Sequence, residues 1–294
     1  MNAEGTSTLT RPRESLFGDT WRRLKRNRLA MVGLVIIVLL FLIAIFAEPL
    51  APYDPIKQNL RESHVPPGSQ HLLGTDIHGR DILSRLIYGT RISLLVGFLP
   101  QFLSLSLAIL LGLLSGYHGG WIDDLIMRLA DAFFAFPSLL FMMALMFVMS
   151  PKQGLLGIVL GLGIVGWAGR ARIMRGQVLS IKERTYIDAA EAIGAPTSRI
   201  IFRHVLPNCV APLIIITTMA IPGAIMAEAG LSFIGLGVPP PTPSWGQMLY
   251  TGRAYIRQFP WLCIWPGLAI LVTVLSFNLF GDGLRDALDP YLKK

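Results

Sequence analysis

The sequence predicts an all-α, polytopic membrane protein with six transmembrane helices. Hydrophobic residues make up 53% of the chain and charged residues only 15%, whereas soluble proteins carry roughly 25% charged residues. The apolar residues gather in runs that approach the roughly 20 residues needed to cross a bilayer as a helix. Lysines and arginines favour alternate loops between these runs, as expected of an oriented membrane protein.

The first predicted span covers residues 29–47 and contains no charged residue. A cluster of basic residues immediately precedes it, at the end of a tail formed by residues 1–28. The apolar run is longer than the roughly 7–15 residues of a signal-peptide core, and the leader before it is too long for one. We therefore interpret this run as an uncleaved membrane anchor.

Five further apolar runs complete the predicted spans, and the third of these is short and rich in glycine. They cover residues 92–114, 130–149, 155–168, 210–227 and 262–281. With both termini in the cytoplasm, 18 of the 26 lysines and arginines lie on the cytoplasmic side. This distribution agrees with the positive-inside rule.

The predicted organisation follows from this topology. A first span is separated by an extracytoplasmic loop, residues 48–91, from a core of five helices, residues 92–281, and a cytoplasmic tail follows at residues 282–294. Gly112 and Gly116 have the spacing that lets helix backbones approach closely. We interpret that pair as packing within the chain rather than as a dimer motif.

A polar, helix-patterned segment, residues 186–208, lies between the fourth and fifth spans. Residues 186–193 are rich in alanine and favour a helix. Gly194 can then adopt the positive φ angle that ends many helices, and Pro196 suits the first turn of a second helix, residues 196–206. Pro207 marks the expected end of that helix. The sequence thus predicts two short helices joined at an angle by one glycine.

This segment carries apolar residues of a kind that proteins usually bury, although it lies outside the predicted bilayer. They are Ile187, Ile193, Ile200, Ile201 and Phe202. Exposed apolar patches of this kind indicate an interaction surface. Either a partner protein or the cytoplasmic surface of the chain itself must cover them, and we favour a partner.

The spacing in this segment resembles the cytoplasmic coupling motif of importer-type ABC permeases: E-A-A, three residues, glycine, nine residues and I-x-L-P. Tyr186 precedes the motif, and the matching residues are Asp188, Ala189, Ala190, Gly194, His204, Leu206 and Pro207. Aspartate replaces the usual glutamate, and histidine replaces the isoleucine. The H-x-L-P-N ending resembles the dipeptide, oligopeptide and nickel branch of these permeases. Further runs, such as GTDIHGRD and AEAGLSFIGLGVPPPTPSWG, resemble the second of the two paired permeases in peptide importers.

This resemblance implies a permease fold with cytoplasmic coupling helices in the cytoplasmic membrane of a prokaryote. It also implies four partners besides membrane lipid: a homologous second permease, two ATP-binding subunits and an extracytoplasmic substrate-binding protein. The sequence contains no G-x-x-x-x-G-K-[ST] phosphate-binding loop. We therefore expect ATP and Mg²⁺ to bind in the partner subunits, and no catalytic residue, cofactor or metal in this chain. The implied cargo is a di- or oligopeptide, with nickel or another small solute as the alternative.

Other classes of protein fit less well. An ion-coupled secondary transporter needs ionisable residues near the middle of the bilayer, and the candidates are Asp131, near the inner end of the third span, and Glu228, near the outer end of the fifth. We interpret both as structural or gating residues. No H-E-x-x-H or G-x-S-x-G motif indicates an enzyme. The net charge of +8 reflects membrane orientation rather than nucleic-acid binding, because aromatic residues are not interleaved with the basic ones.

Arg80 and Asp81 stand in the predicted extracytoplasmic loop. We expect them to pair with neighbouring side chains, either as a solvated loop contact or as a contact to the binding protein. Exposed ion pairs stabilise a fold by only about 0–1 kcal/mol. No strong structural role is therefore expected for these two residues.

Overall fold

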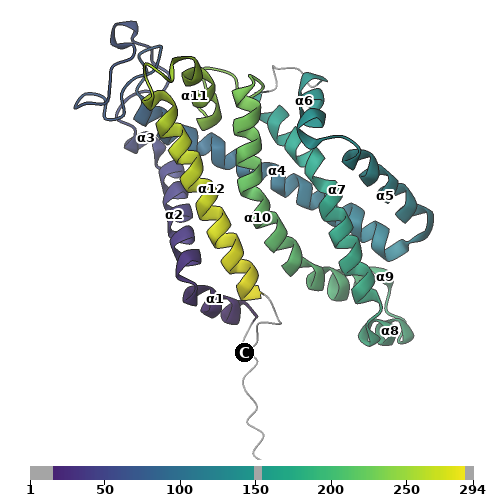
Figure 1. Cartoon of the computed structure of the whole chain (residues 1–294). Coiled ribbons are helices and arrows are strands. Elements are labelled where there is room, and N and C mark those ends of the chain that lie inside the picture. Colours follow the sequence, from purple (N-terminus) through teal and green to yellow (C-terminus); the bar gives the residue numbers. More distant parts are fainter. Residues whose placement is uncertain (1–15, 149–153, 289–294) are drawn as a thin grey trace, which may run out of the picture.

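The structure is a computed structural model that describes residues 16–148 and 154–288, and long helices dominate it (Figure 1). Five helices are long and apolar enough to cross a membrane. They are α2 (Arg28–Ile45), α4 (Ile82–His118), α7 (Gly154–Lys182), α10 (Leu206–Phe233) and α12 (Trp261–Leu288). The bent pair α5 and α6 is a sixth candidate. The described residues thus form the helical membrane protein that the sequence predicts.

The two ends of this bundle are built differently. We call residues 51–81 at one end the cap; beside it lie α3 (Ala47–Leu50), α11 (Trp245–Gly252) and η4 (Arg253–Tyr255), and the cap itself contains η1 (Leu60–Glu62). We call the opposite end the base. It consists of α1 (Leu16–Arg26), α8 (Thr185–Ala192), α9 (Thr197–Ile200) and the π-helical turn η3 (Ile201–Val205).

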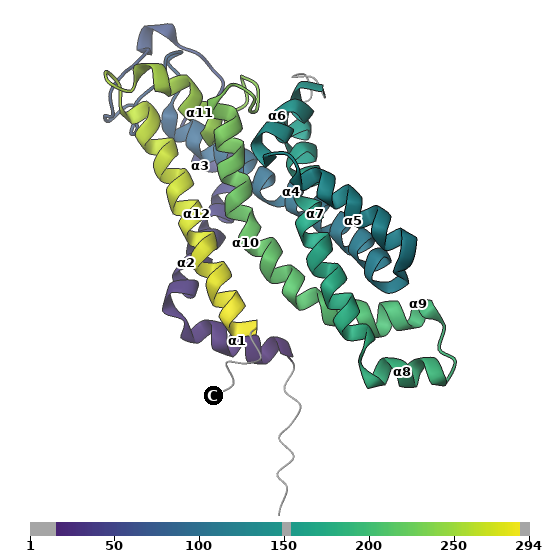
Figure 2. The same ribbon diagram turned by 45° about the vertical axis from the view of Figure 1, so that its right-hand side comes forward.

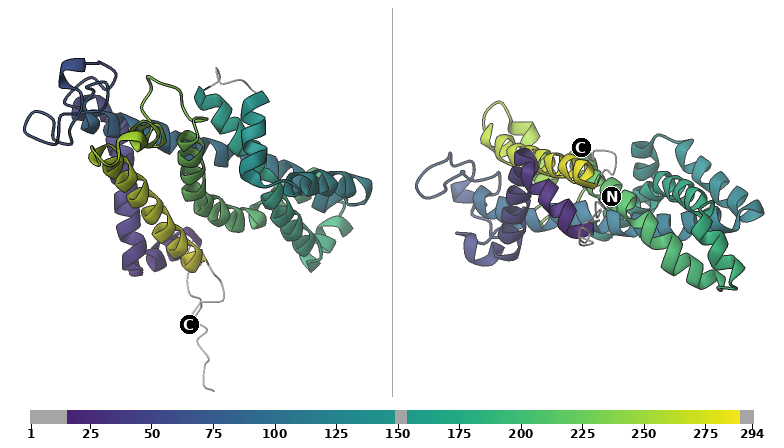
Figure 3. Two further views of the ribbon diagram at one scale, coloured as in Figure 1. Left: turned by 45° about the horizontal axis from the view of Figure 1, so that its top comes forward. Right: turned by 90° about the horizontal axis from the view of Figure 1, so that it is seen from below.

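The base has two separate parts. Helix α1 packs on α2 and α12, whereas α8 and α9 project beyond the end of α7 (Figure 2). Seen from the base, α1 in purple and the α8–α9 region in green lie apart (Figure 3, right). The segment predicted to couple to a partner therefore protrudes and is open to contact.

Helices α4 and α7 pack closely because α4 carries glycine where they meet. A Cβ atom on Gly112 would lie only 2.6 Å from the carbonyl oxygen of Ala171, and one on Gly116 only 2.8 Å from the Cβ of Val178. Real Cβ atoms essentially never approach other atoms this closely. The interpretation of this glycine pair as packing within the chain is confirmed.

Replacing Gly112 with alanine should therefore destabilise the fold. The added methyl group meets backbone, which cannot move aside as a flexible side chain does, and overpacking of this kind costs roughly 1–3 kcal/mol. Gly176→Ala is the matched control, because a Cβ atom there meets nothing within 4 Å and alanine favours a helix over glycine. We expect a lower thermal unfolding midpoint for Gly112→Ala and no loss for Gly176→Ala. Equal midpoints for the two variants would contradict the packing.

The third predicted span, residues 130–149, is not a continuous helix. Helix α5 (Gly120–Phe134) and helix α6 (Ser138–Val148) meet at an angle of 95°. Pro137 lies between them and explains the break, because proline has no N–H and disfavours helical geometry in the residue before it. Residue 149, the predicted end of the span, lies outside the described residues.

The helices at the other predicted spans are longer than predicted, except the first, which ends earlier, at Ile45. Helix α4 begins at Ile82 rather than at 92, so the first turns of this helix belong to the expected loop 48–91. Helix α7 continues to Lys182 rather than stopping at 168, α10 covers Leu206–Phe233 rather than 210–227, and α12 reaches Leu288 rather than 281. The length of an apolar run reflects only the part of a helix that lies within the hydrocarbon of the bilayer. A charged residue ends the apolar run, but the helix can continue beyond it.

Candidate functional site

Helix α8 forms where the sequence predicts the first of two short helices. Gly194 follows it with a φ angle of +77°, and its N–H donates to the carbonyl oxygen of Glu191 at 2.9 Å. The N–H of Ala195 donates to the carbonyl oxygen of Ala190 at 3.1 Å, which closes the end of the helix. Pro196 then stands at the N-cap of α9. The glycine turn between two short helices is confirmed.

The second predicted helix, residues 196–206, does not end at Pro207. Helix α9 passes directly into the π-helical turn η3 and then into α10, so the chain has no break between this segment and the span. Pro207 lies in the first turn of α10, where its missing N–H is tolerated. The wider π turn before it accommodates the proline ring that would clash with the preceding turn of an α-helix. Pro207 therefore shapes this turn instead of ending the helix.

The chain itself covers part of the apolar surface of the segment. Ile187 and Ile200 are buried in a cluster with Met174 and Val178 of α7, which corrects the expectation that a partner covers them. Ile193, by contrast, is 84% exposed, and Phe202 is also exposed. The close approach of α8 to the base end of α7 thus leaves only the outer surface of the segment for a partner.

The residues that match the coupling motif divide between these two surfaces. Asp188 and Ala189 of α8 are exposed, as are Tyr186 and Gly194. Ala190 is only 8% exposed and packs in the cluster beneath α8. An acidic residue at position 190 would therefore disturb the chain itself, whereas position 189 is suited to test contact with a partner.

The end of the motif lies close to its beginning. The imidazole ring of His204, in η3, lies 6.4 Å from the phenol ring of Tyr186, measured between centroids. Leu206 is partly buried and Pro207 is exposed, and the amide of Asn208 donates to the carbonyl oxygen of His204 at 2.6 Å. The structure thus brings both ends of the motif to one side of the base.

Asp131 is not a buried ionisable group. It lies on α5 with its side chain largely exposed and forms an ion pair with Arg172 of α7. The guanidinium group of Arg172 also lies 4.5 Å from the ring centroid of Phe134. These contacts join α5 to α7.

Glu228 lies close to the cap end of α10 and is 1% exposed. One oxygen of its carboxylate accepts hydrogen bonds from the hydroxyl groups of Ser232 at 2.7 Å and Ser244 at 3.0 Å. Ser244 is also the N-cap of α11. Glu228 therefore joins the end of α10 to the start of α11.

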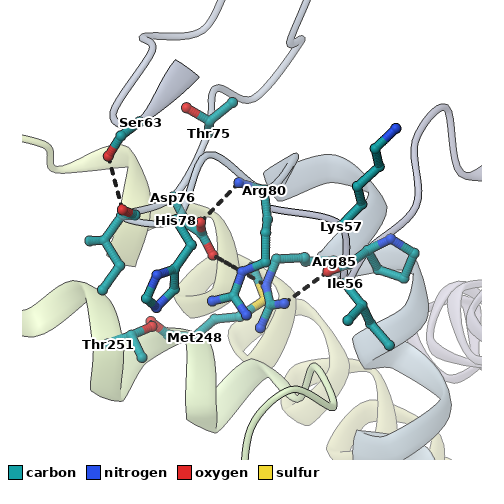
Figure 4. A network of polar contacts seen from close by, with 12 residues as sticks. Ile56, Lys57, Ser63, Thr75, Asp76, His78, Arg80, Arg85, Met248 and Thr251 are labelled. Carbon is teal, nitrogen blue, oxygen red and sulfur yellow. Dashed lines mark hydrogen bonds and ion pairs between the residues drawn. The ribbon is translucent and has the colours of Figure 1, made fainter. Parts of the chain in front are cut away.

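The cap contains a buried polar network that the sequence does not indicate (Figure 4). Arg80 and Asp81 are buried, which corrects the expectation of an exposed pair. Asp76 accepts a hydrogen bond from Nε of Arg80 at 2.7 Å, and Nε of Arg85 lies 3.6 Å from the same carboxylate. Asp81 caps α4 by accepting from the N–H of Ser84 at 2.8 Å. This network fixes the cap on the first turn of α4.

Arg85 carries the network beyond the cap. Its guanidinium group is buried and donates to the carbonyl oxygen of Pro55 and to Oε1 of Gln247, each at 2.9 Å. Gln247 belongs to α11 and lies 162 positions away in the sequence. No local pattern in the sequence reveals such a partner.

The described residues hold no group of three or more histidine, cysteine, aspartate or glutamate side chains arranged to bind a metal ion. The candidate site itself is a protruding helix pair, α8 and α9, that continues through η3 into the span α10. A helical bundle that presents such a segment at one end is the architecture of a membrane transport permease.

The chain belongs to the family described as binding-protein-dependent transport system inner membrane component, which matches residues 108–294. Residues 15–67 match the N-terminal transmembrane domain of oligopeptide transport permease C.

Relatives are similar over nearly their whole length. The chain is 44% identical to the oligopeptide transport system permease protein OppC of Bacillus subtilis, over 100% of this chain and 95% of that protein. It is 42% identical to the dipeptide transport system permease protein DppC of the same organism, over 100% and 91%. It is 43% identical to the glutathione transport system permease protein GsiD of Escherichia coli, over 94% and 90%.

Proposed function

We propose that this chain is the transmembrane permease subunit of an ATP-driven ABC importer and that its cargo is a di- or oligopeptide. The observation that carries the proposal is the protruding segment α8 to η3, which has the spacing of a coupling motif and an exposed apolar residue, Ile193. The names of the three relatives favour peptides over nickel as cargo.

In this proposal the base faces the cytoplasm of a prokaryote, and both termini lie on that side of the cytoplasmic membrane. Basic residues at the base support this orientation, as the positive-inside rule requires. They include Lys25, Arg26, Arg28, Lys182, Arg184, Arg199, Arg203 and Arg285. The cap then lies outside, where a substrate-binding protein delivers the cargo.

The remaining partners are those that the family resemblance implies, and we assign them to exposed surfaces of the chain. An ATP-binding subunit receives the outer surface of α8, and ATP and Mg²⁺ bind in that subunit and its pair. A homologous second permease completes the path, while exposed apolar residues of α2, such as Val35 and Leu42, face lipid. Closure of the ATPases moves the coupling segment, and the spans alternate between outward-open and inward-open arrangements.

Uptake by the reconstituted complex tests this function. Proteoliposomes that contain both permeases, the ATPases and the binding protein should accumulate labelled peptide only when ATP is available to the ATPases. Collapse of the proton and sodium gradients should leave this uptake unchanged. Gradient-driven uptake by vesicles that lack the ATPases would instead establish an ion-coupled transporter.

A further inference from the structure

A chain of buried hydrogen bonds runs from α10 to the cap, and we call it the relay. Its members are Glu228, Ser244, Gln247, Arg85 and Asp76, all buried. The hydroxyl of Ser244 donates to Glu228 at 3.0 Å and accepts from the N–H of Gln247 at 3.1 Å. The side chain of Gln247 accepts from Arg85, which also approaches Asp76. The relay therefore joins four parts of the fold: α10, α11, α4 and the cap.

The relay is a stiff connection because its members are shielded from water. Breaking a buried hydrogen bond leaves an uncompensated polar group, which costs more than the bond itself contributes. A movement of α10 relative to α11 would break the hydrogen bond between Glu228 and Ser244. Displacement of the cap would likewise break the bond between Arg85 and Gln247.

The opposite end of α10 carries the coupling segment. Helix α9, the turn η3 and α10 follow one another without an intervening loop. Helix α10 is thus joined at the base to the surface proposed to receive the ATPase, and at the other end to the cap through Glu228. Helix α10 therefore reaches the coupling segment through continuous backbone and reaches the cap through buried hydrogen bonds.

The relay also borders a cavity of about 220 Å³ at the cap end. Ser232, which donates to Glu228, and Gln247, which accepts from Arg85, both line it. The rest of the lining is largely apolar and includes Met146, Val238 and Tyr250. A shift along the relay would therefore change the wall of this cavity together with the position of α10.

We propose that Glu228 is a positioning residue that ties α10 to the cap, so that the arrival of a loaded binding protein at the cap is transmitted along α10 to the coupling segment. This proposal rests on the proposed function. Its specific content is the path: Glu228 acts through Ser244, Gln247 and Arg85, and it neither contacts cargo nor carries an ion.

The test uses the complete complex in lipid nanodiscs and measures ATP hydrolysis with and without peptide-loaded binding protein. Glu228→Leu removes both hydrogen bonds, and we expect basal hydrolysis and assembly to persist while the stimulation falls. Coupling between distant sites is typically about 5–150-fold, so a fall of about fivefold or more is expected. The binding-protein concentration that gives half-maximal stimulation should stay unchanged, because docking at the cap is intact.

Conservative variants separate transmission from a general loss of packing. Glu228→Gln keeps an oxygen acceptor for both serines and should retain stimulation. Gln247→Leu should reproduce the loss, whereas Gln247→Glu still accepts from Arg85 and should not. The double variant Glu228→Leu with Gln247→Leu should be no worse than either single variant, since residues in one network act non-additively.

Three results would overturn the proposal: full stimulation of Glu228→Leu, equal losses in Glu228→Gln and Glu228→Leu, or additive losses in the double variant. If Glu228→Leu prevents assembly, the variants Gln247→Leu and Gln247→Glu are compared instead. Normal stimulation of Gln247→Leu then overturns the proposal. Failure of the proposed function is distinguishable, because the unaltered complex would then show no ATP-dependent peptide uptake.

Discussion

Replacing Gly194 with valine should abolish ATP-coupled peptide uptake while the complex stays assembled in the membrane. Gly194 holds a φ angle of +77° at the joint between α8 and α9. An L-residue in this conformation is strained by roughly 1–2 kcal/mol, and a β-branched side chain fits it worst. The strain is relieved by rotating α8 against α9. The coupling segment then no longer transmits the closure of the ATPases in the correct geometry.

The control for this variant is Gly194→Asn. A Cβ atom at Gly194 meets nothing within 4 Å, so side-chain volume is not the obstacle and only the backbone conformation distinguishes the two variants. Asparagine tolerates the left-handed region and should retain most uptake. Labelled peptide uptake and ATP hydrolysis are measured on the same proteoliposomes, and hydrolysis should continue in Gly194→Val. Normal uptake by Gly194→Val, or an equal loss in Gly194→Asn, would refute a role for the turn geometry.

The second large effect is expected at Ile193. This side chain is 84% exposed, and the few hot-spot residues that dominate an interface each cost about 2 kcal/mol or more when truncated. If Ile193 is such a residue, Ile193→Asp would place a charge in the contact that we propose between this segment and the ATPase. We expect the ATPase subunits to be lost during co-purification, a decrease in affinity of about thirtyfold or more by that estimate.

The same substitution should leave the fold of the permease intact. Changes at exposed positions usually alter the free energy of unfolding by less than about 0.5 kcal/mol. Leu72→Asp is the control, since Leu72 is an exposed apolar residue in the cap, at the other end of the molecule. Its ATPase subunits should stay bound. If the Ile193→Asp variant retains the ATPase subunits, Ile193 does not belong to the surface that contacts them.

Much of the fold was predictable because the lengths of apolar runs and the positions of basic residues indicate where a chain crosses the membrane and in which orientation. The spans whose predicted bounds were wrong have causes that a hydrophobicity pattern does not show. Pro137 divides the third span although most residues around it are apolar. Lys182 lies at the end of α7 rather than in a loop, because a helix continues past the bilayer wherever tertiary contacts support it.

The sequence spacing predicted where the candidate site lies, but not which of its residues are buried by the chain itself and which are exposed. The motif located Gly194 and α8 correctly, since a positive φ angle and helix-forming alanines act within a few residues. Whether Ile187 or Ile193 meets a partner depends on the position of α7, which is distant in the sequence. The pairing of Arg85 with Gln247 is a tertiary contact of the same kind. Such contacts leave no periodic signal in the chain.

The elbow between α5 and α6 has a consequence for life in a bilayer. Where a helix ends and another begins, the terminal N–H and C=O groups lack partners within the helix, and hydrocarbon offers none. Apolar side chains around the elbow, among them Phe134, Phe136 and Leu139, are nevertheless exposed. Backbone that hydrocarbon cannot satisfy, set beside exposed apolar side chains, is a surface that we expect another protein to cover. The homologous permease proposed above is the candidate, and the break at Pro137 would then shape the contact between the two permeases.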